Sequence, residues 1–320
     1  MRGASKMPDI VSIGECMIEL FSDEPLGAAR SFQKSYAGDT LNVLHMAARL
    51  GASTGYVTRV ADDPFTDYLL DAWRTNGIDT GAVKRVPGFT GMHFISLLPG
   101  GDREFVFYRK GSAASTMTPE DLDVEYIGSA RILHISGIPQ SVSPSMRRTI
   151  LQAAQIAREH GVTISYDTNL RANMWSAKEA QEAMSEVLPY VDIVFPSHPE
   201  ETGALLGLES ETEVIDYFRS RGVETVAITC GEGGAVVGTE EGVFSLDAVA
   251  PHGVADTTGA GDAFVGGFLH CLVQGLGTVV GAKWGIACAG LKIAGRGAIG
   301  SQPGRRQVEE LAGSVQVHRL

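Results

Sequence analysis

The chain has 320 residues, of which 44% are hydrophobic and 20% are charged, and its formal net charge is −12. This length and apolar content suffice for one large α/β domain with its own core. The negative charge argues against a nucleic-acid-binding protein, because phosphate backbones are bound by clustered Lys and Arg. No apolar run reaches the roughly 18 residues of a membrane helix, and no apolar signal core follows residues 1–6. We therefore expect a cytoplasmic protein.

The first third of the chain predicts a buried strand followed by hairpin strands that belong elsewhere. Residues 10–14 are largely β-branched, as in a buried strand. Short apolar runs within residues 16–36, and strand-like runs at residues 91–98 and 104–109 around a Pro-Gly-Gly-Asp turn at residues 99–102, predict a small separate sheet. Between these segments we expect a helix ended by Gly51, a strand at residues 54–60 and a helix at residues 64–76.

From residue 131 onward the chain alternates strands with helices. We expect strands at residues 131–136, 162–167, 192–196 and 225–229, and helices at residues 144–160, 176–188, 199–206, 212–221 and 281–294. This repetition implies a parallel sheet with helices on both faces. Ligands of such sheets bind beyond the carboxyl ends of the strands. The polar residues there are candidates for a nucleotide and metal site: Asp167, Asn169, Arg171, Ser197, Glu200, Thr229, Gly231 and Gly234.

The segment Asp-Thr-Thr-Gly-Ala-Gly-Asp at residues 256–262 precedes an apolar run that predicts a buried helix opening just after Gly259. Unpaired N–H groups and the helix dipole make such a start favourable for an anion such as phosphate. Asp262 beside them could accept the proton of an attacking hydroxyl while the N–H groups hold the charge of a phosphoryl group. That is a kinase arrangement. The alternative is an acidic residue in the first turn of an ordinary capped helix.

Two other small-residue segments are less specific. The sequence Tyr-Ala-Gly-Asp-Thr-Leu-Asn at residues 36–42 stands before a predicted helix, where Asp39 or Thr40 fits a plain N-cap. Gly-Glu-Gly-Gly at residues 231–234 resembles a dinucleotide-binding loop only weakly, because Val236 stands where the third glycine belongs. No Gly-Lys-Ser or Gly-Lys-Thr occurs, so the common P-loop is absent.

Residues 256–262 match, without a gap, the signature of the ribokinase-like (PfkB) carbohydrate kinases, and the chain resembles that family from residue 9 to about residue 305. The resemblance implies a ribokinase-like α/β fold: a mostly parallel sheet with helices on both faces plus a small β-sheet lid. The kinase domain is expected at residues 9–310, with lid segments at about residues 15–37 and 89–112. The resemblance assigns the role of general base to Asp262 and an anion hole to Gly259, Ala260 and Gly261, with ATP and Mg²⁺ as cofactors.

Further family motifs have counterparts here. A sugar-binding Gly-Gly-Asp-x-x-Asn element corresponds to Gly38, Asp39 and Asn42, with Ala37 replacing its first glycine. An ATP-binding Thr-x-Gly-x-x-Gly loop corresponds to Thr229, Gly231 and Gly234. A magnesium-organising Asn-x-x-Glu motif corresponds to Ser197 and Glu200, with Ser replacing Asn. Relatives hold a monovalent cation at the place of residues 295–301, which implies Asp256 and Ser301 as K⁺ ligands.

Two arginines indicate an anionic acceptor. Arg109 and Arg171 each offer a fork that pairs with a carboxylate or phosphate, which a neutral sugar does not require. For Arg109, an exposed hairpin end is the alternative. The sequences of residues 14–20, 107–113 and 167–175 resemble those of one branch of the family, the 2-keto-3-deoxygluconate kinases. That resemblance places Phe107, Tyr108, Arg109 and His93 at the sugar acid, and Asn169 and Arg171 near ATP and the transferred phosphate.

The sequence therefore predicts transfer of the γ-phosphoryl group of ATP to the C6 hydroxyl of 2-keto-3-deoxygluconate. A kinase of the same fold for fructose, tagatose, ribose or a related deoxy-keto sugar acid is the main alternative. A non-catalytic sugar-binding module and a dehydrogenase are the others. The open edges of the lid sheet favour pairing between copies, so a homo-oligomer, dimer or larger, is expected, with no nucleic-acid or membrane partner.

Overall fold

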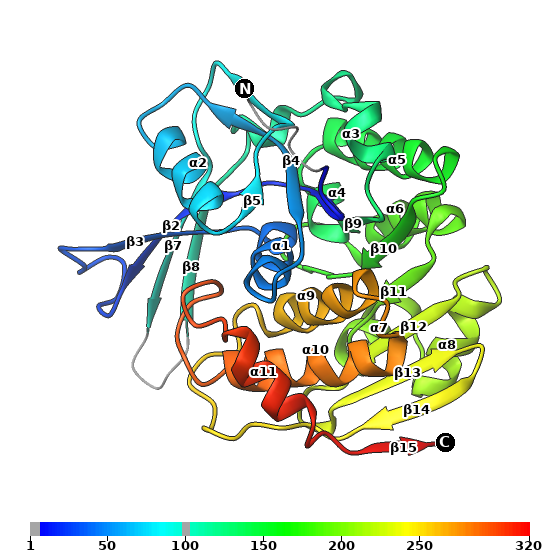
Figure 1. Cartoon of the computed structure of the whole chain (residues 1–320). Helices are drawn as coiled ribbons and strands as arrows, with labels where there is room; N and C mark the ends of the chain where they lie inside the picture. Colours follow the sequence, from blue (N-terminus) through cyan, green and yellow to red (C-terminus); the bar gives the residue numbers. More distant parts are fainter. Residues whose placement is uncertain (1–6, 98–102) are drawn as a thin grey trace, which may run out of the picture.

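The computed structural model describes residues 7–97 and 103–320, and its centre is a large twisted sheet (Figure 1). Among the described residues this sheet has eleven strands, in the order β15-β14-β13-β12-β11-β10-β9-β1-β4-β5, with β6 paired to β4. Pairing is parallel from β12 to β5 and antiparallel among β12, β13, β14 and β15. The strands are β1 Ile10–Ile13, β4 Thr54–Ala61, β5 Ile78–Asp79, β6 Val83–Val86, β9 Ile132–Ser136, β10 Thr163–Asp167, β11 Ile193–Phe195, β12 Thr225–Thr229, β13 Ala235–Thr239, β14 Gly242–Leu246 and β15 Val317–Arg319.

Helices cover both faces of this sheet, as predicted (Figure 1). One face packs against α5 Pro144–Glu159, α6 Ala177–Val187 and α8 Glu211–Arg219. The other packs against α1 Asp39–Arg49, α2 Thr66–Thr75, α9 Ala260–Val273 and α10 Thr278–Lys292. Successive strand residues alternate between the two cores, so that Ile132 faces α9 whereas Leu133 faces α5. Shorter helices complete the layers: α3 Val124–Gly128, α4 Gly137–Val142, α7 Glu200–Leu206 and α11 Arg305–Ala312.

A second, four-stranded sheet stands away from the main body, at the left of Figure 1. Its order is β3-β2-β7-β8, with β2 Met17–Ser22, β3 Gln33–Ala37, β7 Met92–Leu97 and β8 Arg103–Tyr108. Two antiparallel hairpins, β2–β3 and β7–β8, are joined by parallel pairing of β2 with β7. This is the predicted lid, although its predicted turn at residues 99–102 lies outside the described residues.

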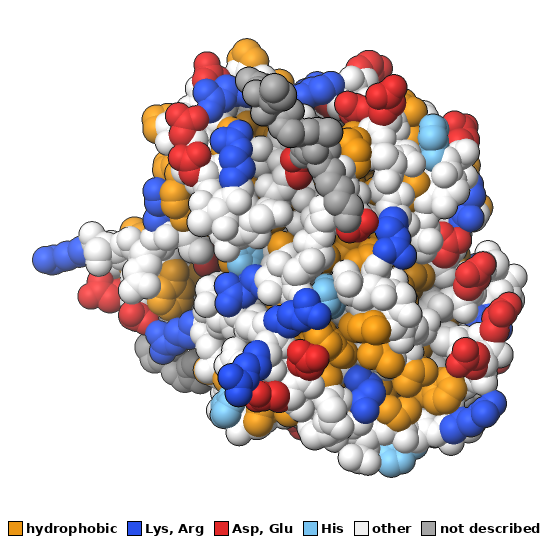
Figure 2. Space-filling model, in the orientation of Figure 1, with side chains coloured by type: hydrophobic (Ala, Val, Ile, Leu, Met, Phe, Trp, Pro, Cys, Tyr) orange, Lys and Arg blue, Asp and Glu red, His pale blue; other side chains and the backbone are white. Residues whose placement is uncertain are grey.

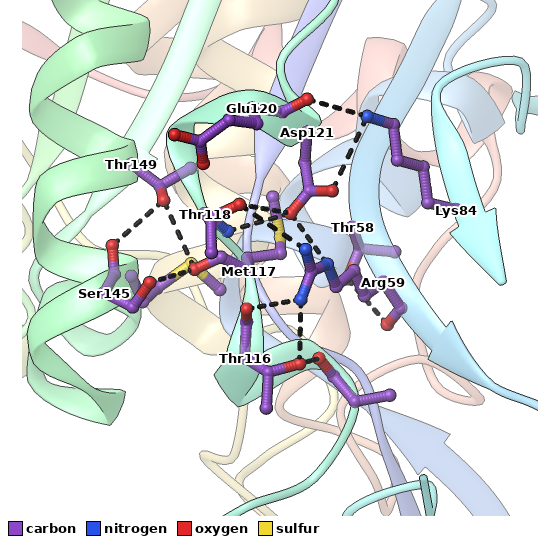
Figure 3. A network of polar contacts seen from close by, with 12 residues as sticks. Thr58, Arg59, Lys84, Thr116, Met117, Thr118, Glu120, Asp121, Ser145 and Thr149 are labelled. Carbon is purple, nitrogen blue, oxygen red and sulfur yellow. Dashed lines mark hydrogen bonds and ion pairs between the residues drawn. The ribbon is translucent and has the colours of Figure 1, made fainter. Parts of the chain in front are cut away.

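A polar network fixes the chain where it leaves the lid for the main body (Figure 3). Arg59 of β4 forms an ion pair with Asp121 at 2.7 Å and donates to the carbonyl of Thr116. Lys84 of β6 approaches the same carboxylate at 3.5 Å. From the other side, Ser145 of α5 donates to the carbonyl of Met117. The segment after β8 is thus bound to two layers of the main body.

Several elements were not expected from the sequence: the β13–β14 hairpin, β15, α4 and α11. Within residues 7–97 and 103–320, no helix combines the length and apolar character needed to cross a membrane. Figure 2 shows acidic and basic side chains interspersed over one face, so that face is not the basic surface that nucleic acid requires.

Candidate active site

A cavity of about 820 Å³ lies between the lid and the carboxyl ends of the parallel strands. This size suits a small-molecule ligand. Three groups of residues line it. From the lid and the segments next to it come Glu15, Met17, Glu19, His93, Ile95, Phe105, Phe107 and Arg109; from the start of α1, Gly38, Asp39 and Asn42; from the strand ends and the start of α9, Asp167, Asn169, Arg171, Ser197, Glu200, Glu201 and residues 257–262.

Asp262 lies buried in the first turn of α9 and faces Asn42 of α1. The Asn42 side-chain nitrogen donates to Asp262 Oδ2 at 2.7 Å. Burial raises the pKa of Asp262 to about 7, although the Asn42 hydrogen bond acts in the opposite direction. A carboxyl group that exchanges its proton near neutral pH is suited to general base catalysis.

Glycines bring the starts of α1 and α9 to the cavity. Gly259, the N-cap of α9, has a left-handed φ of 76°, and a Cβ there would lie 3.0 Å from the Cβ of Ala298. At Gly38, the N-cap of α1, a Cβ would lie 2.1 Å from the carbonyl oxygen of Glu15. A Cβ on Gly261 would meet nothing within 4 Å, so the α9 backbone is open to a ligand there. The geometry fits the predicted anion hole.

Four of the acidic side chains that line the cavity belong to the start of α1, the strand ends and the starts of α7 and α9, namely Asp39, Asp167, Glu201 and Asp262. Burial raises the pKa of Asp39, of Asp167 and of Glu201, and their mutual repulsion adds to this for Asp167. The positive charge of Arg171 opposes the shift in each case. Such a concentration of carboxyl oxygens fits Mg²⁺, which prefers oxygen ligands. The described residues include no group of three His, Cys, Asp or Glu arranged to hold a metal.

Glu201 is a site residue that the sequence reasoning missed. Its carboxylate accepts hydrogen bonds from the backbone N–H groups of Leu170 and Ser197, and so joins the ends of β10 and β11. Glu200, the predicted residue, lies at the cavity but is exposed. A signal was present in the sequence, since two adjacent acids follow Ser197 and only one can turn inward at the start of α7.

Arg109 is already paired in the cavity. Its Nη2 contacts the buried carboxylate of Glu15, and its Nη1 lies 3.1 Å from the sulfur of Met174. Burial lowers the pKa of Arg109 to about 10, which leaves the guanidinium charged at neutral pH. Arg171 lines the same cavity.

The lid strands place His93 and Phe107 in the cavity but not Tyr108. His93 Nε2 lies 3.2 Å from Glu19 Oε2, and its ring stacks on Phe107 with centroids 5.6 Å apart. Tyr108 is 58% exposed and packs edge-on against Phe94. Because side chains alternate along a strand, Phe107 and Arg109 face the cavity and Tyr108 faces away. The structure therefore does not place Tyr108 at the predicted substrate site.

Of the remaining predicted residues, Asn169 lines the cavity, whereas Thr229, Gly231, Gly234, Asp256 and Ser301 lie outside its lining. Thr229 joins the site through its hydroxyl, which lies 2.8 Å from the hydroxyl of Ser197. Gly231 and Gly234 follow with positive φ values of 55° and 86°. Asp256 and Ser301 meet at Gly297: Asp256 Oδ2 accepts from its N–H at 2.8 Å, and the Ser301 hydroxyl donates to its carbonyl at 2.8 Å. Asn169 lines the cavity with a positive φ of 36°, which Asn tolerates better than most residues.

The fold and the cavity together define a kinase of the α/β class. Over residues 7–305 the chain matches the model of the pfkB family carbohydrate kinases, and it belongs to this family. The predictions of fold and enzyme class are confirmed, and the dehydrogenase alternative is wrong.

Relatives in this family differ in the sugar that they phosphorylate. The chain is 33% identical over 315 residues to a 2-dehydro-3-deoxygluconokinase of Thermoproteus tenax, covering 96% of this chain and 95% of the relative. It is equally 33% identical over 328 residues to fructokinase-1 of Oryza sativa subsp. japonica, covering 98% and 100%. A crystal structure of an E. coli protein in complex with ATP and Mg²⁺ superposes with a TM-score of 0.88 at 25% identity, covering 96% of this chain and 99% of the other.

Proposed function

We propose that this kinase transfers the γ-phosphoryl group of ATP to the C6 hydroxyl of 2-keto-3-deoxygluconate, which is the same compound as 2-dehydro-3-deoxygluconate. The observation that carries the proposal is that Arg109 and Arg171 line one cavity with Asp262. A sugar acid would place its carboxylate at an arginine fork and its far hydroxyl at the base. The similarity to the Thermoproteus tenax enzyme supports this acceptor.

In the proposed mechanism, Gly38, Asp39, Asn42, His93, Phe107 and Arg109 hold the acceptor. Asn42 orients the Asp262 carboxylate, which takes the proton from the C6 hydroxyl as that oxygen attacks the γ-phosphorus. The bond from the γ-phosphorus to the bridging oxygen breaks, and ADP leaves. The backbone at Gly259, Ala260 and Gly261 receives the developing negative charge. ATP lies against Asn169, Arg171, Ser197, Thr229, Gly231 and Gly234. When bound, Mg²⁺ neutralises phosphate charge, and Glu201, with Glu200 at the rim, would hold it through its water shell.

A neutral ketose such as fructose is the second candidate acceptor, and one observation favours it. The charge of Arg109 is already compensated by the buried Glu15, so a substrate carboxylate must compete with Glu15 for the guanidinium. The similarity to the rice fructokinase supports this alternative equally by identity.

ADP release with ATP and Mg²⁺ against a panel of 2-keto-3-deoxygluconate, 2-keto-3-deoxygalactonate, fructose, tagatose and ribose tests the proposal. We expect the highest kcat/KM for the keto acids. In addition, Arg109→Gln should raise KM for a keto acid by about 10- to 100-fold, the loss of a charged hydrogen bond, while changing KM for fructose little. A preference for a neutral sugar, unaffected by Arg109→Gln, would overturn the acceptor while leaving the kinase assignment intact.

We also propose that the protein forms a homo-oligomer through its lid. On the face of the lid sheet that points away from the cavity, Val106 and Tyr108 are exposed, and Phe32 lies beside Phe94 on the same sheet. The edges of this sheet, β3 and β8, have no further strand paired to them among the described residues. A second copy would cover both the apolar side chains and an open edge.

A further inference from the structure

Lys292, the last residue of α10, has no exposed surface at all. Its side-chain nitrogen donates to the backbone carbonyl of Asp256 at 2.7 Å. Removing an ammonium group from water is costly unless opposite charge and hydrogen bonds compensate it. The Asp256 carboxylate supplies that opposite charge. Burial opposes its ionisation, but hydrogen bonds from the N–H groups of Thr258 and Gly297, together with the charge of Lys292, lower the pKa of Asp256 to about 2.

The position of Lys292 links it to the phosphate-binding backbone. Asp256 begins the loop that leads into α9, and Gly259 at the end of this loop is the N-cap of that helix. Figure 1 shows α10 running alongside α9. A cation at the end of α10 is also favoured by the negative end of the α10 dipole.

The backbone N–H, the carbonyl and one carboxylate oxygen of Asp256 are bonded to the end of α10 or to the segment after it. Its N–H donates to the carbonyl of Ile293 at 3.0 Å, and its own carbonyl accepts from Lys292. Its carboxylate accepts from the N–H of Gly297 at 2.8 Å and from the N–H of Thr258 at 2.7 Å. Lys292 therefore supplies one of the contacts that hold the start of this loop against the end of α10.

We propose that the ammonium group of Lys292 takes the place of a bound monovalent cation, so that the kinase needs no added K⁺. Lys292 is a positioning residue: it holds residues 256–259 and supplies positive charge behind the anion-binding backbone. K⁺ bound at Asp256 and Ser301 would meet the like charge of the ammonium group. The charge of Lys292 also reaches the base, because it lowers the pKa of Asp262 against the larger raising effect of burial. This inference rests on the proposed phosphoryl transfer but not on the identity of the sugar.

The first arm of the test is a titration of the unmodified enzyme with KCl, from none to about 100 mM at constant ionic strength, with whichever acceptor in the panel is active. We expect kcat to change by less than about twofold. Strong activation by K⁺ would overturn the inference directly, whatever any variant does. Inactivity on every acceptor would count against the proposed function instead. In that case the effect of KCl is measured on the affinity of the enzyme for ATP–Mg²⁺, by calorimetry.

The second arm replaces the charge. Lys292→Met keeps the length of the side chain but not the ammonium, and should lower kcat by about 10- to 100-fold while leaving the acceptor KM nearly unchanged. Added K⁺ or NH₄⁺ should restore part of that loss, which a purely structural role would not produce. Lys283→Met, on the same helix and only partly buried, is the matched control and should keep its activity. Full activity of Lys292→Met without K⁺, or a loss that neither cation restores in a variant that melts cooperatively, would overturn the inference.

Discussion

Asp262 combines the burial and the partner that a base near neutral pH requires. Its raised pKa, about 7, means that kcat/KM should rise as the pH increases through that value, since only the ionised carboxylate accepts a proton. Asp262→Asn should lower kcat by about 10²- to 10⁴-fold with little change in KM for ATP. The measurement is ADP release from pH 5.5 to 9. An Asn variant that retains a tenth or more of kcat would exclude Asp262 as the base.

The same carboxyl group should reduce stability at high pH. A group whose pKa is raised by folding contributes stability that is complete below its unfolded pKa, near 4, and that is lost as the pH rises through the folded value of about 7. Asp262→Asn removes this loss. We expect the variant to have a higher Tm than the original protein at pH 8 and a similar Tm at pH 4. Equal Tm values at pH 8 would contradict the raised pKa.

The adjacent acids Glu200 and Glu201 should differ in their importance. Glu201 is held by the N–H groups of Leu170 and Ser197, whereas Glu200 is exposed. Glu201→Gln should therefore raise the Mg²⁺ concentration needed for half-maximal activity by about 10-fold or more. Glu200→Gln is the matched control, with an effect below about threefold. If a Mg²⁺ titration showed that Glu200→Gln needs more Mg²⁺ for half-maximal activity than Glu201→Gln, Glu200 would have the role that the sequence motif assigned to it.

At the scale of elements, we expect the two glycines at the start of α9 to serve different purposes: Gly259 is required for folding and Gly261 for ligand binding. Gly259→Ala should lower stability by about 1–2 kcal/mol, because its φ is left-handed and its Cβ would press on Ala298. Gly261→Ala has open space and helical backbone, so it should leave Tm unchanged while its methyl group obstructs the phosphate and raises KM for ATP. Thermal melting and ATP titration of both variants check this. A Gly261→Ala variant with normal KM would show that no ligand approaches that backbone.

The accuracy of the sequence predictions varied from element to element for physical reasons. Apart from α4, the strand and helix alternation from β9 to β12 was predicted correctly, because each strand contains β-branched residues and α6 and α8 begin with a Ser–Glu capping box. The β13–β14 hairpin was missed because glycines interrupt its apolar pattern. The family resemblance placed Tyr108 at the substrate, but side chains alternate along a strand, so Tyr108 faces away from the cavity while Phe107 faces it. For Glu201 the sequence offers two adjacent acids, and the direction of the first turn of α7 decides which of them faces the cavity.

The molecule as a whole should assemble through its lid. Light scattering at micromolar concentration is expected to give a dimer or larger. Tyr108→Lys should weaken that assembly, because Tyr108 is exposed on the outer face of the lid, and should leave the acceptor KM nearly unchanged. Leu276→Lys, at an exposed apolar residue between α9 and α10, is the control. A monomeric original protein would exclude the assembly, and a raised acceptor KM in Tyr108→Lys would return Tyr108 to the substrate site.

The order in which the cavity residues occur along the chain bears on how such kinases diversify. The lid and the start of α1, which surround the side of the cavity that we propose for the acceptor, lie within residues 15–109, whereas the strand ends and the start of α9 lie within residues 167–262. Substitutions in the first block that keep Asn42, the partner of Asp262, can therefore alter which sugar is accepted without changing the residues assigned to ATP and the base. A graft of residues 15–109 from a relative with another acceptor is then a compact route to a new specificity.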